Sequence, residues 1–224
     1  MWCIGEITVQ YIAQMEEILH LYGLAPNEKW PLVCFDEKSY QMIGHTIEPI
    51  EMKPGQPAKI SEKYVRGGTV QILVAFLPMW GLRFVWVGPK RRATDFAAFM
   101  KDLLNNFLPS VLPKAKGIRM VCDNLNTHKK GSLYKMYNPE QALDLANKIQ
   151  FHYTPVNASW LNMAEMEIYA ISRICLKRRM EHQKFVTTEV QTLVKERNEA
   201  RTKVNWMFAP DKAREKFKRA YNKI

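Results

Sequence analysis

Two aspartates directly follow apolar segments of the sequence, where a carboxylate is well placed to take part in a reaction. Asp36 follows "LVCF" and Asp123 follows "MVC". When two such strands are neighbours in one sheet, carboxylates at their ends can meet at a common edge. The alternative is that each carboxylate only opens the turn after its strand, as acidic side chains commonly do.

A third carboxylate is predicted on the helix after "HYTPVNASW", which carries both Glu165 and Glu167. Two residues at about 100° each place these glutamates on nearly opposite faces, so only one of them can enter a given site. Glu167 shares its face with Met163 and Ile171, whereas Glu165 lies on the more polar face near Asn162. We therefore expect Glu165 to be the third acid.

Three carboxylates without histidines at metal-ligand spacing form an oxygen-rich site, which suits Mg²⁺ or Mn²⁺ better than zinc. Two such ions about 4 Å apart can activate a nucleophile and stabilise the leaving oxygen at a phosphodiester. The charge fits that substrate, because 33 Lys and Arg against 22 Asp and Glu give a net charge of +11 and basic proteins favour nucleic acid. The 22 acids also allow many other triplets, so turn and cap carboxylates remain the alternative.

Other classes of protein are disfavoured by the composition. The four cysteines form no CxxC pair, which argues against a zinc knuckle or a disulfide scaffold. The longest apolar runs are broken by Pro and Gly and are too short for a membrane span, and the first residues lack the pattern of a secretory signal. We expect a soluble, intracellular protein with no membrane partner.

The elements that must position the acids are indicated by hydrophobic periodicity. Strands are predicted at 32–36, 41–52, 69–78, 82–88, 117–123 and 149–155. Helices are predicted at 7–22, 94–108 (with Thr94 as N-cap and Pro109 as its end), 132–148 with a break near Pro139, 161–181, 186–201 (opened by Thr187 or Thr188) and 211–222. Strands that alternate with helices after an antiparallel start predict a mixed sheet covered by helices, an α/β fold.

The sequence resembles the catalytic region of bacterial insertion-sequence transposases in the mariner-type branch of the DDE superfamily. The resemblance extends from about Ile4 to Tyr221 and is carried by "CFDEKSYQ", "MKPGQPAKI", "EKYVRGGT", "VCDNLNTHK", "HYTPVNASWLNMAEMEI" and "NWMFAPDKAREKFKRAY". It implies a ribonuclease-H-like fold, a mixed five-stranded sheet flanked by helices. In that fold the first strand, the fourth strand and a later helix supply the acids, here Asp36, Asp123 and Glu165.

The resemblance also implies an activity, cofactors and partners. Such enzymes cut double-stranded DNA at transposon ends by metal-dependent hydrolysis, with two Mg²⁺ or Mn²⁺ ions. The freed 3′-hydroxyl then attacks target DNA, typically at a TA dinucleotide. A homodimer on DNA is expected, in the cytoplasm and associated with the nucleoid. A separate helix-turn-helix polypeptide from an upstream reading frame is a further expected partner. The predicted organisation is a linker helix at 1–30, the catalytic domain at 31–182 and a helical extension packed on it at 183–224.

Further polar residues surround the predicted acids. Those expected to support the site are Asn124, Asn126, His128, Trp160 and Asn162. Asn124 and Asn126 could instead serve only the turn after the strand, and Trp160 could pack the loop rather than stack on an unpaired base. The expected phosphate contacts are Lys38, Lys53, Arg66, Arg91, Arg92, Lys129, Lys130, Arg173, Lys177 and Arg178.

Two other functions remain compatible with the sequence. A ribonuclease-H-like nuclease would share the metal chemistry but would not join a 3′ end to new DNA. A catalytically inactive remnant would retain only DNA binding through its basic surface. Assays for cleavage and for joined products separate the three.

Overall fold

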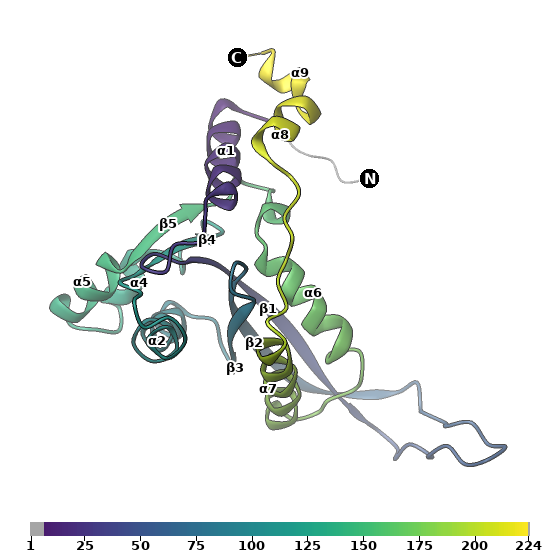
Figure 1. Ribbon diagram of the computed structural model, residues 1–224. Coiled ribbons are helices and arrows are strands. Elements are labelled where there is room, and N and C mark those ends of the chain that lie inside the picture. Colours follow the sequence, from purple (N-terminus) through teal and green to yellow (C-terminus); the bar gives the residue numbers. More distant parts are fainter. Residues whose placement is uncertain (1–6, 224) are drawn as a thin grey trace.

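The computed structural model describes residues 7–223, and its centre is a sheet with the strand order β3-β2-β1-β4-β5 (Figure 1). The strands are β1 (Leu32–His45), β2 (Tyr64–Leu77), β3 (Leu82–Gly88), β4 (Ile118–Cys122) and β5 (Ile149–Tyr153). β1, β2 and β3 are antiparallel neighbours, whereas β4 runs parallel to β1 and β5 parallel to β4. The predicted mixed five-stranded sheet is confirmed.

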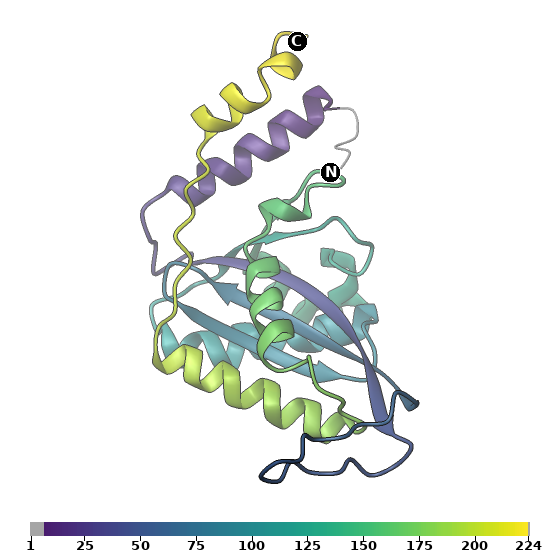
Figure 2. The ribbon, with the colours of Figure 1, turned by 90° about the vertical axis from the view of Figure 1, so that its right-hand side faces the viewer.

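Helices cover both faces of this sheet (Figures 1 and 2). One face carries α2 (Ala93–Asp102), its continuation η1 (Leu103–Phe107) and α3 (Leu108–Val111), together with α4 (Lys130–Tyr134) and α5 (Pro139–Asn147). The other carries α6 (Ala164–Ile174) and α7 (Gln183–Glu199). Beyond the sheet, α1 (Val9–Gly23) lies beside α8 (Pro210–Lys216) and α9 (Lys218–Tyr221), while η2 (Ser159–Leu161) precedes α6.

The two faces explain why "LVCF" is apolar at every position. Successive side chains of a strand point to opposite faces of the sheet. Val33 and Phe35 pack with α2 and its neighbours, whereas Leu32 and Cys34 pack with α1 and η2. All four are buried. The next residue on the side of Leu32 and Cys34 is Asp36, so its carboxylate faces the layer that contains α6.

The first strand is much longer than predicted. The separate strand expected at 41–52 is wrong, because Gln41–His45 continue β1 after a bulge between Gln41 and Ile43 and pair with the start of β2. β2 therefore begins at Tyr64 rather than at residue 69. These added residues include three glycines and show no regular alternation of apolar and polar side chains, so hydrophobic periodicity does not reveal the pairing. The chain between β1 and β2, residues 46–63, projects from the sheet as an arm (Figure 1).

The helices differ from prediction in their bounds, three of them in ways that have a physical explanation. The helix expected at 94–108 starts at Ala93, capped by Arg92 and Asp95, and the chain stays helical past Pro109. Pro109 follows directly on the π-helical turn η1, in which the Leu108 N–H bonds to the Leu103 carbonyl oxygen, so the regular α-helical hydrogen-bond ladder is already interrupted where the proline lies. The helix expected to reach residue 181 ends at Ile174, and α7 opens at Gln183, before Thr187.

α7 covers the edge of the sheet that β3 would otherwise expose. Three of its side chains, from Gln183, Gln191 and Asn198, donate hydrogen bonds to the carbonyl oxygens of Val87 (3.4 Å), Val85 (2.7 Å) and Arg83 (2.8 Å). The Asn198 side chain also accepts from the Arg83 N–H at 2.8 Å. An uncovered edge strand invites pairing with another chain, and these bonds remove that hazard.

The last residues of the described chain pack on its first helix. Arg214 and the Tyr221 hydroxyl both donate to the carboxylate of Glu16 on α1. Ala213 and Phe217 are buried with Tyr11 and Met15 beneath these polar contacts. The predicted extension at 183–224 is thus divided, with α7 on the sheet and α8 and α9 on α1. No described helix combines the length and apolar character needed to cross a membrane.

Candidate active site

Strand register places the first two acids side by side. The parallel pairing of β1 with β4 ends with Cys34 opposite Val121, and continuing it by two residues puts Asp36 opposite Asp123. Adjacent strands lie about 4.8 Å apart, and the charge of Asp123 contributes to the raised pKa of Asp36. The sequence predicted that Asp36 ends its strand. This is wrong, because β1 continues beside β2 past Asp36. Asp36 lies where β4 ends and β1 loses its partner on that side.

Asn162 fixes the helix that carries the third acid against Asp36. Its side chain is buried, and its amide group donates to the Phe35 carbonyl oxygen at 2.8 Å and to the Asp36 carboxylate at 3.4 Å. Its side-chain oxygen accepts from the N–H of Ala164, the first residue of α6. A single buried amide thus connects β1 to the start of α6, one residue before Glu165.

The two glutamates of α6 have opposite environments. The Glu167 carboxylate is fully buried between Arg83 of β3 (3.0 Å) and Arg197 of α7 (2.8 Å). Glu165 is partly exposed, and its negative charge acts on Asp36. The buried glutamate is already neutralised by two cations, so the glutamate that remains able to bind a ligand is Glu165.

Asp36 lies in an environment that disfavours its charge. Burial is the largest cause and, with the charges of Glu165 and Asp123, raises its pKa to about 7, despite a hydrogen bond from the Glu37 N–H (2.7 Å) and the nearby His128. A cation bound beside Asp36 would therefore stabilise the charged form of its carboxylate.

His128 holds the second acid. Its Nδ1 lies 2.5 Å from Asp123 Oδ1 and its Nε2 lies 3.2 Å from Glu37 Oε2. Burial alone would lower the pKa of His128, but these two carboxylates outweigh it and raise the pKa to about 9. The imidazolium therefore bridges β1 and the loop after β4, with its ring packed edge-on against Phe35.

Glu37 is the residue that the sequence reasoning missed. Its carboxylate is 7% exposed and binds both His128 and Arg91, the latter at 3.0 Å. The available signal was its place directly after Asp36, since neighbouring strand residues face opposite sides. Asp36 therefore faces α6, while Glu37 faces His128.

The remaining predicted supporting residues have other surroundings. Asn124 and Asn126 are exposed in the loop after β4, and Asn126 accepts a hydrogen bond from Lys129. Trp160 packs edge-on against Phe208, with ring centroids 5.5 Å apart, and against Phe217. The packing interpretation therefore fits Trp160 better than base stacking.

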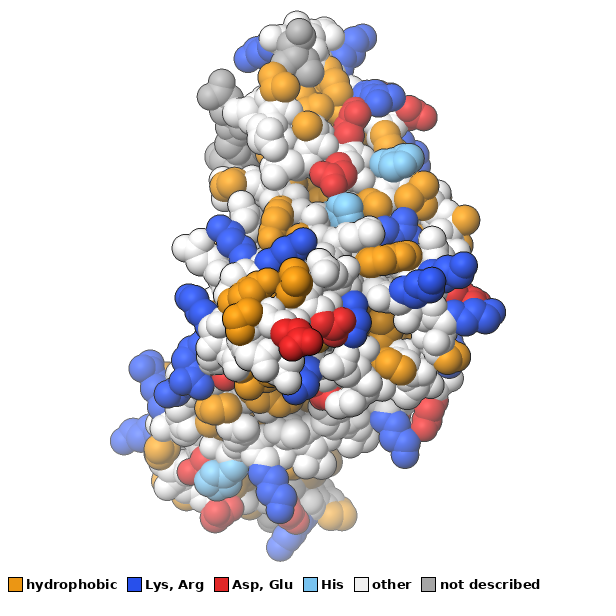
Figure 3. Space-filling view, turned by 90° about the vertical axis from the view of Figure 1, so that its left-hand side faces the viewer, with side chains coloured by type: hydrophobic (Ala, Val, Ile, Leu, Met, Phe, Trp, Pro, Cys, Tyr) orange, Lys and Arg blue, Asp and Glu red, His pale blue; other side chains and the backbone are white. Residues whose placement is uncertain are grey.

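The predicted phosphate contacts do not form one continuous patch. Lys38 lies two residues beyond Asp36 on the same face of β1, whereas Lys53 and Arg66 lie on the arm and on the adjoining part of β2. Arg91, Arg92 and Arg178 pair with Glu37, Asp95 and Glu189, respectively. Lys129 and Lys130 begin α4, on a face where Lys and Arg are interspersed with Asp and Glu (Figure 3). Arg173 and Lys177 follow Glu165 along α6 and just beyond it.

The donor chemistry of the three acids fits a hard divalent cation. Asp36, Asp123 and Glu165 offer only carboxylate oxygens, the ligands that Mg²⁺ and Mn²⁺ favour. Within residues 7–223, however, no three His, Cys, Asp or Glu side chains are already arranged to hold a metal ion. Asp123 directs one oxygen to His128, so its other oxygen and the Glu165 side chain would have to turn towards Asp36.

Comparisons with known proteins agree with this arrangement. The family described as "DDE superfamily endonuclease" matches residues 31–187, the part of the chain that contains all three acids. A comparison with curated proteins found no match.

Among solved structures, the chain resembles the Mos1 mariner paired-end complex with Mn, with 16% identity and a TM-score of 0.50. The match covers 90% of this chain and 64% of the Mos1 chain. A pre-cleavage Mos1 transpososome is also similar, with 14% identity and a TM-score of 0.49, over 90% of this chain and 64% of the other. The first likeness confirms the ribonuclease-H-like fold. With the family match over residues 31–187, it follows that this chain belongs to the DDE superfamily endonucleases.

Proposed function

We propose that this chain is the catalytic domain of a DNA transposase. It would hydrolyse phosphodiester bonds at transposon ends and join the freed 3′-hydroxyl to target DNA. The observation that carries the proposal is that the charges of Asp123 and Glu165 both act on Asp36, just beyond the paired part of β1 and β4. We assign it to the mariner-type branch and to a bacterial insertion sequence, on the motifs described above.

Asp36, Asp123 and Glu165 are the proposed ligands of two Mg²⁺ or Mn²⁺ ions. When bound, such ions activate the attacking oxygen and stabilise the leaving oxygen of a phosphodiester. The chain itself orients the ligands. His128 holds one oxygen of Asp123, and Asn162 fixes the start of α6 against Asp36. The related Mos1 structure is a complex with Mn, which supports the choice of metal.

Double-stranded DNA is the proposed substrate, at transposon ends and at TA-containing targets. The related Mos1 structure is a paired-end complex, which supports a homodimer that holds two ends together. The chain spans 64% of the Mos1 chain. A separate helix-turn-helix polypeptide from an upstream reading frame is the further partner that we propose for recognition of the terminal repeats. The net charge of +11 supports an intracellular place of action on the nucleoid.

The proposal is tested with a labelled duplex that carries the terminal repeat bordering the gene, and a TA-containing plasmid as target. Wild-type protein should give cleaved and joined products in Mg²⁺ or Mn²⁺ and none in EDTA. Asp36→Ala, Asp123→Ala and Glu165→Gln should each lower cleavage by about 100-fold or more while DNA binding persists. Glu140→Gln, at an exposed position of α5, is the matched control and should keep full activity.

Each contrary result has its own meaning. Full activity in one of the three variants removes that residue from the site. Cleavage without joined products would identify a nuclease that lacks strand transfer. DNA binding without any products in either metal would identify an inactive remnant.

A further inference from the structure

The outer side of α6 combines exposed apolar groups with unpaired cations. Tyr169 is 65% exposed and Met166 is 49% exposed. Arg173 and Lys177 have no carboxylate within ion-pair distance among residues 7–223, unlike Arg178, which pairs with Glu189. Tyr169, Arg173 and Lys177 line one open hollow with Ser172. Figure 2 shows α6 in front of the sheet on this side.

This hollow adjoins the third acid. Tyr169 follows Glu165 by four residues, which places both on the same side of α6 and about 6 Å apart along its axis. Arg173 lies one further turn along, and Lys177 follows just beyond the helix end. A DNA strand with one phosphate at Asp36, Asp123 and Glu165 would therefore reach the Tyr169 ring first, and then Arg173 and Lys177.

The other aromatic rings near the acids have partners within the fold. Trp160 packs against Phe208 and Phe217, and Phe35 packs against Phe96 and His128. Among the described residues, Tyr169 makes no ring–ring contact and belongs to neither buried cluster of this side. An exposed, unpartnered aromatic ring beside cations is the arrangement by which proteins bind unpaired nucleotides.

We propose that Tyr169 stacks on an unpaired base next to the scissile phosphate, and that Arg173 and Lys177 bind the phosphates that follow. The inference rests on the proposed function, because it requires DNA at Asp36, Asp123 and Glu165. A fully paired duplex hides the faces of its bases, so stacking requires an open or single-stranded end. The site therefore prefers DNA whose end is unpaired over the same sequence as a blunt duplex.

The test measures binding of two labelled DNAs of the same sequence, one a blunt duplex and the other with a short 3′ overhang. The first unpaired base of the overhang is 2-aminopurine, whose fluorescence falls when it stacks. Ca²⁺ replaces Mg²⁺ and compensates the negative charge of the three carboxylates. Tyr169→Ala should weaken overhang binding roughly tenfold or more, abolish the loss of fluorescence and leave blunt-duplex binding unchanged. Tyr169→Phe should restore both properties.

Two further variants separate stacking from charge and from surface effects. Arg173→Ala should weaken the binding of both DNAs by the same factor. It should also make binding less dependent on salt, as expected for a phosphate contact. Tyr134→Ala removes an exposed tyrosine from α4, on the opposite face, and should change neither DNA's affinity. Circular dichroism confirms that each variant is folded.

The possible failures are distinct. If wild-type protein binds neither DNA, the proposed function falls and this inference falls with it. If wild-type protein binds both DNAs equally well, or Tyr169→Ala binds the overhang as tightly as wild type, only the stacking site is overturned. Equal loss on both DNAs in Tyr169→Ala would also overturn it, because Tyr169 would then contribute to DNA binding without stacking on an unpaired base.

Discussion

At the scale of single residues, environment separates side chains of the same type. Glu165 and Glu167 are two positions apart, yet Glu167 is enclosed by Arg83 and Arg197 while Glu165 remains partly open. Removing one partner of a buried ion pair leaves an uncompensated charge and is strongly destabilising. Glu167 therefore stabilises the packing of α6 on β3 and α7, which leaves Glu165 for chemistry.

Asp36 shows the opposite relation, in which a functional charge lowers the stability of the fold. Its folded-state pKa is about 7, against an ordinary value of 3.8. Between these two values the unfolded chain loses the proton first, so the free energy of unfolding falls as the pH rises from about 4 to about 7. Above pH 7 the whole cost is present, on the order of a few kcal/mol.

This cost predicts that Asp36→Asn stabilises the metal-free protein. In EDTA at pH 8 the variant should unfold at a higher temperature than wild type, because its amide carries no charge yet can still accept the Glu37 N–H. At pH 5, where Asp36 is protonated in the folded protein but mostly ionised in the unfolded chain, the difference should be smaller, and below about pH 4 it should nearly vanish. Thermal unfolding followed by circular dichroism measures both.

Adding Mg²⁺ at pH 8 provides the control for that prediction. The cation should raise the melting temperature of wild type and leave that of Asp36→Asn nearly unchanged. Equal melting temperatures of the two metal-free proteins at pH 8 would contradict a destabilising charge at this position.

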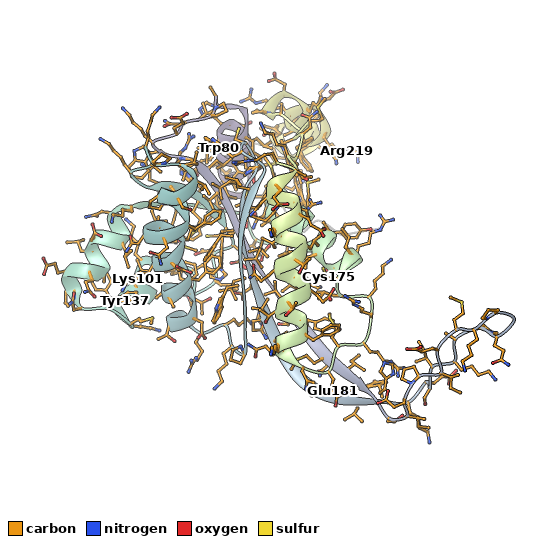
Figure 4. All side chains as sticks on the ribbon, turned by 60° about the horizontal axis from the view of Figure 1, so that its bottom comes forward. Trp80, Lys101, Tyr137, Cys175, Glu181 and Arg219 are labelled. Carbon is orange, nitrogen blue, oxygen red and sulfur yellow. The ribbon has the colours of Figure 1, made fainter. Side chains whose placement is uncertain are left out.

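At the scale of elements, the segment after α6 anchors the arm. The Met180 carbonyl oxygen accepts a hydrogen bond from the Ile43 N–H at 3.0 Å. Arg179 donates to the carbonyl oxygens of Lys63 and Glu62. The backbone of Glu181 passes so close to Gly67 that a Cβ there would overlap the Glu181 carbonyl oxygen. Figure 4 shows Glu181 where the arm leaves the sheet. The segment that contains Glu181 therefore connects α6 to the base of the arm.

Gly67→Ala should disturb this junction. The added methyl group meets backbone rather than a flexible side chain, so relief requires a shift of the strand, at about 1–3 kcal/mol. Denaturant unfolding should show the loss, and hydrogen exchange should rise in residues 41–45 and 64–68. Gly131→Ala on α4 is the matched control, since its Cβ would meet nothing within 4 Å. If the two variants were equally stable, the close approach at Gly67 would be excluded.

At the scale of the whole molecule, the two ends of the described chain form one layer. Figure 2 shows α1 and α8 side by side above the sheet. Their contact has a buried apolar part around Phe217 and a partly exposed polar part between Glu16 and Arg214. Burial of apolar area stabilises such a contact far more than a surface ion pair does.

Phe217→Ala and Arg214→Ala separate these two parts. Phe217→Ala should lower the free energy of unfolding by about 3 kcal/mol and increase hydrogen exchange in α1. Arg214→Ala, in the neighbouring turn, should leave both measurements nearly unchanged because its guanidinium is exposed to solvent. A larger effect of Arg214→Ala would show that the ion pair, rather than the apolar contact, holds α1.

Much of this organisation was predictable from local patterns. The strands around Val33, Val85 and Val121 and the helix after Thr94 are marked by runs of buried side chains, which hydrophobic periodicity detects. The extension of β1 to His45 was not predictable in this way, since its residues are mostly polar and are held by pairing with Tyr64 and its neighbours. Likewise, the packing of α8 and α9 on α1 joins segments about 200 residues apart, and no local pattern encodes such a contact.

For the site, the sequence by itself determined which acids were available and which glutamate of α6 faces away from the apolar side, because residue types and helical geometry are local. Only the tertiary structure placed Asp36 beside Asp123, since that depends on the register between strands far apart in the chain. It also brought Glu37 to His128 and Arg83 to Glu167. Charges interact through space rather than along the chain, so the pKa of Asp36 and the neutralised state of Glu167 were decided by the fold.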